Sequence, residues 1–200
     1  MGLIQEEFTP RNSYETALEE VLKVIEVPRE YKLKEVRCGT QNESAVWIFR
    51  YVKSDGNHLL GGEHYSFTVE QKTLKLLGLT WMDQRFVSDQ RLPSQERTKD
   101  VAKLFLESVQ PGLFERLDNH WIRPHDEQIG INGRKLVITG MKFKCYMAED
   151  DTWAWVIVGP DENIITFEQG IKWENGRITE KWLHDSWVLE LGISESITVL

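Results

Sequence analysis

The chain has 200 residues, of which 40% are hydrophobic and 28% charged, and its formal net charge at pH 7 is −8. This composition is typical of a globular protein with a sizeable core and excludes a wholly disordered chain. No apolar run approaches the roughly 20 residues of a transmembrane helix, so no membrane partner is expected. Nucleic acid is not an expected partner either, because phosphate binding needs a basic surface.

The first predicted element is an amphipathic helix over residues 14–27. Apolar residues recur from Ala17 to Ile25 at the spacing of one helix face, Asn12 or Ser13 is a suitable N-cap, and Pro28 ends the pattern. Alternating and β-branched segments then predict three or four antiparallel strands. These strands are expected at 33–36, 45–52, 64–70 and 74–81.

The second half begins after a polar linker at 83–93. Ser94 is expected to cap a second helix over 95–109, and Pro111 follows its end. The segment 119–133 is polar and contains Pro124, so an irregular loop is predicted there. Further strands are expected at 135–139, 141–147, 153–158 and 164–173.

The two halves have the same order of elements, and their last strands end alike. Gly78-Leu79-Thr80-Trp81 closes the first half, and Gly170-Ile171-Lys172-Trp173 closes the second. This similarity predicts an α+β fold of two helix-on-antiparallel-sheet repeats in tandem, each in α-β-β-β order. The expected domains are a first repeat at 1–82, a linker at 83–93, a second repeat at 94–174 and a tail at 175–200. The tail is expected to pack on the second repeat or on the interface between repeats.

The helical segment Val101–Leu106 and the hairpin Val156–Phe167 resemble the PepSY-type repeat and related tandem bacterial modules, which are cystatin-like in architecture. The resemblance covers residues 95–173 and, more faintly, 14–81. It implies a helix packed on an antiparallel sheet and a role in binding or inhibition rather than catalysis. Such modules usually lie outside the cytoplasm, often beside peptidases. This chain departs from them because it shows no export signal, and a cytoplasmic location is expected.

Metal ligation and cofactor binding are not predicted. His120 and His125, with Asp118 and Asp126, are the one local group of suitable ligand types, but a spacing of five along a polar loop is not a zinc pattern. Asp150-Asp151 lacks the carboxylate and glycine spacing of a calcium loop. No metal, no cofactor and no phosphate-binding glycine pattern is expected.

Catalytic residues are not predicted either. His184-Asp185-Ser186 has the residue types of a triad, but adjacent residues cannot place the histidine between the other two. Gly192–Ser196 lacks the last glycine of a nucleophile elbow. Cys38 and Cys145 are expected to be free thiols that act as small core residues. We therefore expect a protein that is not an enzyme.

The eight tryptophans are the most unusual feature of the composition. Trp153 and Trp155 are two apart in a predicted strand, so their side chains share one face. Tryptophan is enriched at binding hot spots, although packing in a core or between repeats is its commoner use. The candidate binding residues are Trp81, Trp153, Trp155, Trp173, Trp182 and Trp187.

Three functions are compatible with the sequence. The preferred hypothesis is a non-enzymatic protein that binds a protein or peptide through an aromatic sheet face or a sheet edge. The second is a small-molecule-binding protein or enzyme with a pocket between the repeats, which a cavity lined by two or more of His120, His125 and His184 would favour. The third is an immunity-type protein that neutralises a toxin.

Overall fold

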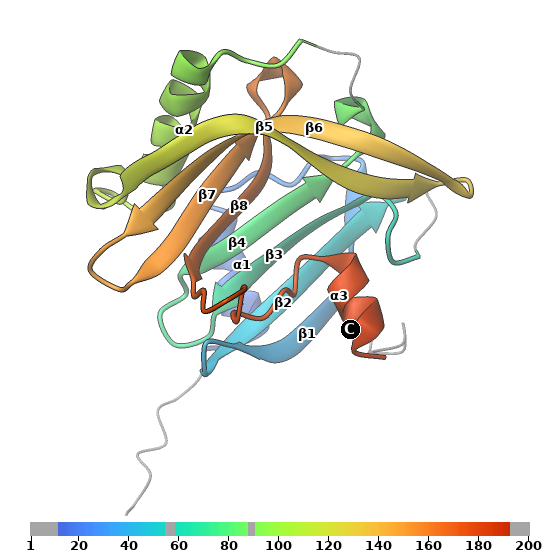
Figure 1. The fold of residues 1–200 in the computed structure, drawn as a ribbon. Coiled ribbons are helices and arrows are strands. Elements are labelled where there is room, and N and C mark those ends of the chain that lie inside the picture. Colours follow the sequence, from blue (N-terminus) through green and yellow to red (C-terminus); the bar gives the residue numbers. More distant parts are fainter. Residues whose placement is uncertain (1–11, 55–58, 88–90, 193–200) are drawn as a thin grey trace, which may run out of the picture.

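The computed structural model describes residues 12–54, 59–87 and 91–192, and in these residues eight strands form one antiparallel sheet (Figure 1). The strands are β1 (Tyr31–Gln41), β2 (Ser44–Lys53), β3 (His64–Glu70), β4 (Leu76–Met82), β5 (Asp118–Ile131), β6 (Arg134–Met147), β7 (Thr152–Val158) and β8 (Ile164–Ile171). The α-helices are α1 (Tyr14–Val21), α2 (Gln95–Val109) and α3 (Asp185–Glu190), with short 3-10 helices η1 (Gln84–Phe86), η2 (Phe114–Arg116) and η3 (Pro160–Glu162). The predicted α+β class is confirmed.

The sheet runs in the order β1-β2-β3-β4-β8-β7-β6-β5. Each half of the chain therefore contributes four consecutive strands, where the predicted order had three. The two halves meet where β4 pairs with β8, and Leu79 lies opposite Phe167 at this junction. We call the β4–β8 pairing the seam. One continuous sheet consequently joins segments that were expected to form separate layers.

Helices α1 and α2 begin where the sequence predicts. The Ser13 and Ser94 hydroxyls accept hydrogen bonds from the backbone N–H groups of Thr16 and Arg97, respectively, which satisfies donors that the first turn leaves open. α2 has its predicted bounds. α1 ends at Val21 rather than at 27, because the chain tightens into i→i+3 hydrogen bonds after it.

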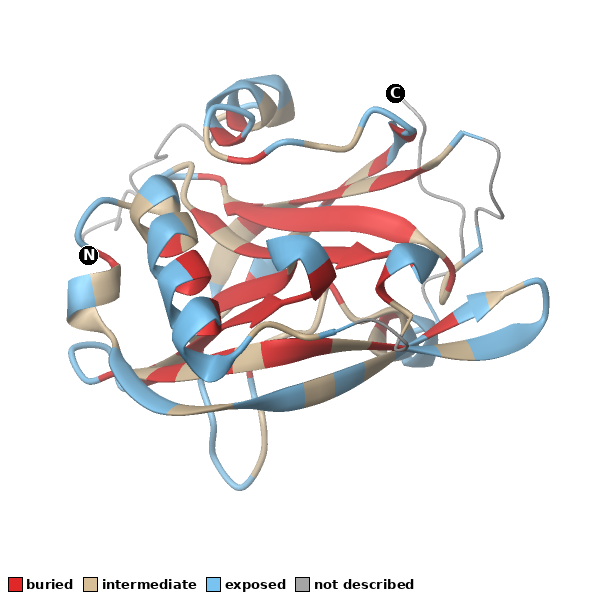
Figure 2. Ribbon diagram, turned by 90° about the horizontal axis from the view of Figure 1, so that it is seen from above, coloured by how far each residue is buried: buried red, intermediate tan, exposed pale blue. Residues whose placement is uncertain are grey.

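The main core lies between the sheet and these two helices. Phe49 and Phe67 stack with ring centroids 4.8 Å apart, and Phe105 of α2 packs edge-on against Phe167 at 5.3 Å. Leu79 and Phe167 are almost completely buried at the seam. Figure 2 shows buried residues along the central strands and exposed residues on the outer sides of the helices. We call this side of the sheet the helix face.

The predicted loop at 119–133 is wrong, because these residues form most of the edge strand β5. Asn132 and Gly133 have φ values of 50° and 74° and connect β5 to β6 in a two-residue turn. The strand escaped detection because Ile129 is its one buried residue, so no apolar alternation marks it. Pro124 is tolerated here because an edge strand can lack one ladder hydrogen bond.

The segment 172–192 crosses the other side of the sheet, which we call the tail face. The Trp182 indole donates to the carbonyl of Thr40 at 2.7 Å, and a Glu180 carboxylate oxygen accepts from the Asn42 N–H at 2.9 Å. Figure 1 shows α3 in front of the sheet and α1 behind it. The tail thus contacts β1 and its turn as well as β8. The segment Ile193–Ser196, which completes the glycine-serine motif considered above, lies outside the described residues.

Candidate functional site

A cleft of about 710 Å³ opens on the tail face directly above the seam. Its floor includes Thr80 of β4 and Thr166 of β8, whose hydroxyls are 3.2 Å apart. Its walls are the end of β5, the loop 59–62 and the start of α3. We call it the seam cleft. It exists because the two halves of the chain contribute floor and walls together.

Three segments that are far apart in the sequence are hydrogen-bonded around the cleft. The N–H of Gly130, at the end of β5, donates to the carbonyl of Gly61 at 2.7 Å. The N–H of Gly61 donates to Asp185 Oδ2 at 2.6 Å. The loop 59–62 therefore connects the β5–β6 hairpin with α3.

His64 is a titratable residue of the cleft floor, and only 3% of it is exposed. Its Nδ1 lies 3.0 Å from the Gly62 carbonyl and 3.5 Å from Asp185 Oδ2. Both partners are acceptors, so Nδ1 carries the hydrogen and Nε2 is left as an acceptor. Nε2 is buried and has no hydrogen-bond partner within the described part of the chain.

The ionisation of His64 is set by its surroundings. Burial, and then the positive charge of Arg50, lower its pKa to about 4. The imidazole is therefore neutral at pH 7, which preserves the acceptor lone pair on Nε2. A buried acceptor without a donor is costly, and a ligand or a water in the cleft would relieve that cost.

Asp185 holds the start of α3 against the sheet. Its carboxylate receives two hydrogen bonds from the Arg50 guanidinium, at 2.7 and 2.9 Å. Burial acts to raise the pKa of Asp185, but His64 and Arg50 outweigh it and hold the pKa at about 2. The pair is therefore charged at neutral pH, and its two-pronged geometry fixes the wall of the cleft.

A second buried ion pair anchors the tail to β8. Arg177 donates to both Glu168 oxygens, at 2.7 and 3.1 Å, and His184 Nε2 lies 3.3 Å from Glu168 Oε2. Burial acts to raise the pKa of Glu168, but His184 and Arg177 lower it to about 2. His184 therefore faces this pair while Asp185 faces Arg50, so these neighbours do not act as one triad.

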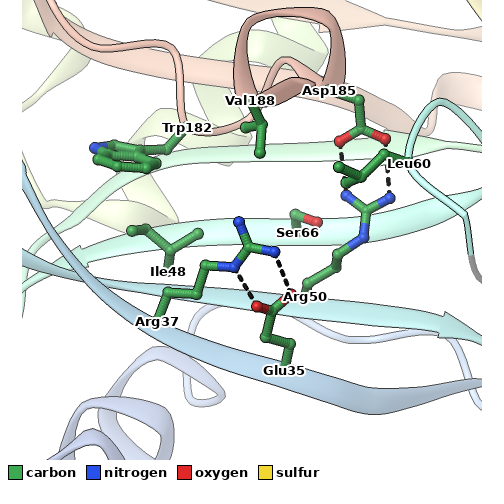
Figure 3. Close-up of a pocket in the computed structure, with 9 residues that line it drawn as sticks. All are labelled: Glu35, Arg37, Ile48, Arg50, Leu60, Ser66, Trp182, Asp185 and Val188. Atoms are coloured by element: carbon green, nitrogen blue, oxygen red, sulfur yellow. Dashed lines mark hydrogen bonds and ion pairs between the residues drawn. The ribbon is translucent and has the colours of Figure 1, made fainter. Parts of the chain in front are cut away.

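A smaller cavity of about 20 Å³ lies beside the cleft, beneath Trp182 and Val188. Figure 3 shows the Arg37 and Arg50 side chains rising toward it, each bonded to its carboxylate partner. The hydroxyl of Ser66 lies between them without a partner among the described residues. This volume suits about one water molecule. The seam cleft is therefore the candidate site for a ligand.

The candidate tryptophans fall into three separate groups. The first lies on the tail face of β6, β7 and the chain after β8, interleaved with two lysines. Lys144 Nζ is 4.2 Å from the Trp153 ring and 5.3 Å from the Trp173 ring, and Lys142 Nζ is 4.0 Å from the Trp155 ring. Trp173 is 51% exposed, whereas Trp155 is buried.

The other candidate tryptophans lie elsewhere. Trp182 and Trp187 pack edge-on at 5.1 Å over the start of the sheet. Trp81 is buried in the helix-face core against Phe86, with ring centroids 5.0 Å apart. The six tryptophans thus do not form one aromatic surface.

The remaining sequence candidates are not brought together. His120 packs edge-on against Trp153 at 5.2 Å, and His125 Nε2 lies 2.9 Å from Glu127 Oε1. No group of three or more potential ligands could hold a metal ion in the residues that the structure describes. Among the three histidines named in the pocket hypothesis, His184 alone lines the seam cleft, and His64 joins it.

The two cysteines differ in environment. Cys145 is buried as expected, and its burial raises the pKa of the thiol to about 12. Cys38 is exposed, so the expectation of a core residue is wrong for it. Its position on the edge strand β1, where alternate residues face solvent, explains the difference.

Sequence reasoning missed His64, Arg50 and Glu168. One signal was available in β3, where His64, Ser66 and Thr68 alternate with aromatic and aliphatic residues. All three are buried, and alternation alone would have placed them in solvent. Only the tail, which covers this face, makes them interior residues.

No helix in the described ranges is long and apolar enough to span a membrane. No protein-family model, no curated protein and no solved structure matches the chain. The PepSY-type resemblance therefore stays a prediction.

Proposed function

We propose that the protein binds a small molecule in the seam cleft and does not transform it. The observation that carries this proposal is the unpartnered Nε2 of His64, which is buried in the floor of a cleft of about 710 Å³. Ligand sites are typically clefts of about 300–1,000 Å³ with a few placed polar groups among apolar side chains. Buried polar groups without partners are rare, so this acceptor supports a ligand that donates to it.

The charges around His64 favour binding over catalysis. Its carboxylate neighbour Asp185 would normally make the imidazole a stronger base, but Arg50 neutralises that carboxylate. With a pKa of about 4, His64 would be a weak proton acceptor at neutral pH, where general bases work best with a pKa near 7. We therefore propose that the protein is not an enzyme.

We also propose that the two halves are repeats of one helix-and-sheet unit, of the PepSY or cystatin-like kind, and that the cleft follows from their pairing. Leu79 and Phe167 occupy equivalent places, since each lies in the fourth strand of its half, opposite a buried residue of the third. The sequence similarity had aligned Leu79 with Ile171 instead. The seam in this proposal is a pseudo-symmetric contact between the two last strands.

The test is a fragment screen followed by amide NMR. A bulky side chain at Ser186, which is exposed at the cleft wall, should block the site without disturbing the core. We expect reproducible fragment hits that shift amides of the floor strands and that are lost in Ser186→Trp. Glu19→Trp, at an exposed position of α1 on the opposite face of the sheet, should retain them. Hits that survive Ser186→Trp, or that all map elsewhere, would refute the proposal.

A second candidate function is the binding of a protein or peptide by the tryptophan-lysine group. The observation in its favour is Trp173, which is 51% exposed beside Lys144. An immunity-type role, in which the partner is a toxin, is one form of this hypothesis. Under it, Trp173→Ala would abolish capture of a specific partner, and Ser186→Trp would leave that capture unchanged.

A further inference from the structure

We infer that the ligand of the seam cleft is an organic amine, an ammonium group carried on an apolar body. This inference rests on the small-molecule function proposed above and specifies the chemical class. It depends on three properties of the lining: which hydrogen-bonding roles are open, which charges are present, and where the apolar side chains lie.

The cleft offers open hydrogen-bond acceptors beside the donors of Gln128, Lys135 and Ser186. His64 Nε2 is buried just beneath the cleft floor and has no donor among the described residues, so a ligand reaches it by a small shift of the side chains above it. Asp126 receives the Thr139 hydroxyl on Oδ1 at 2.7 Å, and Glu127 Oε1 contacts His125 at 2.9 Å, so each carboxylate keeps its second oxygen for another donor. An ammonium carries three donors and no acceptor, which matches these positions.

The charge of the lining is negative. Asp126 and Glu127 contribute two carboxylates from β5, which point to opposite faces of the strand because the two residues are neighbours in it, and Lys135 is an exposed cation on the same rim. Asp185 is already neutralised by Arg50, whose two terminal nitrogens are both bonded to it. Among the described residues, an anion would have Lys135 as its one charged partner at the rim and would otherwise meet carboxylates and a neutral imidazole, whereas a cation gains from the carboxylates.

The apolar part of the lining lies next to these acceptors. Met82, Ile129 and Leu183 are buried around the cleft, and Leu189 extends from α3 at its rim. A ring or alkyl chain placed against them is removed from water, which contributes affinity in proportion to the area buried. The cleft thus combines a polar floor and one acidic wall with an apolar side.

The test compares ligands that differ in the head group alone. Phenethylamine, phenethyl alcohol and phenylacetate are titrated into the full chain, as are tryptamine, tryptophol and indoleacetate, and amide NMR gives the site and the affinity. We expect each amine to bind in the cleft more tightly than its carboxylate by at least about tenfold, the usual effect of a charge-assisted hydrogen bond.

A variant that removes one carboxylate charge tests whether the acidic wall contributes to amine binding. Glu127→Gln should weaken amine binding several-fold and leave the alcohols unchanged, whereas Glu19→Gln, at an exposed position of α1, should change neither. Carboxylates that bind the cleft as tightly as the amines would overturn the inference while supporting a ligand site. If no probe of any class shifts cleft amides, and the fragment screen also finds no cleft hit, the proposed function itself fails.

Discussion

At the scale of single residues, the tail face is defined by charged and polar side chains that the fold removes from water. Three arginine-carboxylate pairs and one neutral histidine lie between the sheet and the tail, with little exposure to water. Ion pairs of this kind contribute little net stability, but removing one partner leaves a buried charge and is strongly destabilising. His64 differs from them because its stability contribution depends on staying neutral.

His64 should make the protein less stable as the pH falls. Its folded pKa of about 4 lies below the ordinary value of 6.5, so the unfolded chain gains a proton first and stability is lost between these two values. At pH 5 the loss should be about 2 kcal/mol, at about 1.36 kcal/mol per pH unit. Urea unfolding at pH 7 and pH 5 measures it.

The variant His64→Gln should lose this part of the pH dependence. His120→Gln, at an exposed position of β5, is the matched control and should retain the dependence of the original chain. Equal losses at pH 5 in the original chain and in His64→Gln would show that His64 is not the group responsible.

At the scale of elements, the β5–β6 hairpin shows that a long strand can lack the side-chain pattern from which strands are predicted. The Asn132-Gly133 dipeptide is a strong hairpin signal, and it ends the segment predicted as a loop, just before the strand predicted at 135–139. The β5 side chains are mostly exposed on both faces, so periodicity carried no information there. The residues of the turn would have predicted this hairpin better than side-chain periodicity did.

Two glycines of this hairpin should respond differently to alanine. A Cβ at Gly140 would lie 2.5 Å from Ile157 Cγ2 and 3.0 Å from the Val158 carbonyl, which forces a neighbouring strand to move. Gly140→Ala should therefore cost about 1–3 kcal/mol of unfolding free energy. At Gly130 the nearest atom would be 3.5 Å away, so Gly130→Ala should be nearly neutral. Chemical denaturation that ranks the two variants equally would contradict this account.

At the scale of the whole molecule, the seam makes the two halves one folding unit. Leu79 and Phe167 face each other across β4 and β8 with about 1% or less of their surface exposed. A continuous core on the helix face then couples both four-stranded halves. A destabilising substitution at the seam should consequently lower the stability of strands in both halves.

Leu79→Ala should reduce the unfolding free energy by about 2–5 kcal/mol, the usual cost of a large cavity in a core. Hydrogen exchange should show similar loss of protection in β2 and β7, which lie in different halves. Leu104→Ala, at a position that is 70% exposed on α2, is the control and should change little. Protection lost in the first half alone would mean that the halves fold independently.

The sequence by itself determined the α+β class, the start of both long helices and most strands, because caps, prolines and side-chain periodicity act over a few residues. The pairing of β4 with β8, the burial of His64 and Glu168, and the seam cleft were decided only by the tertiary structure. These features join segments that are tens of residues apart, and local patterns state which side chains share a face but not what covers that face. The polar residues of β3 illustrate the limit, since they become interior groups only because the tail crosses above them.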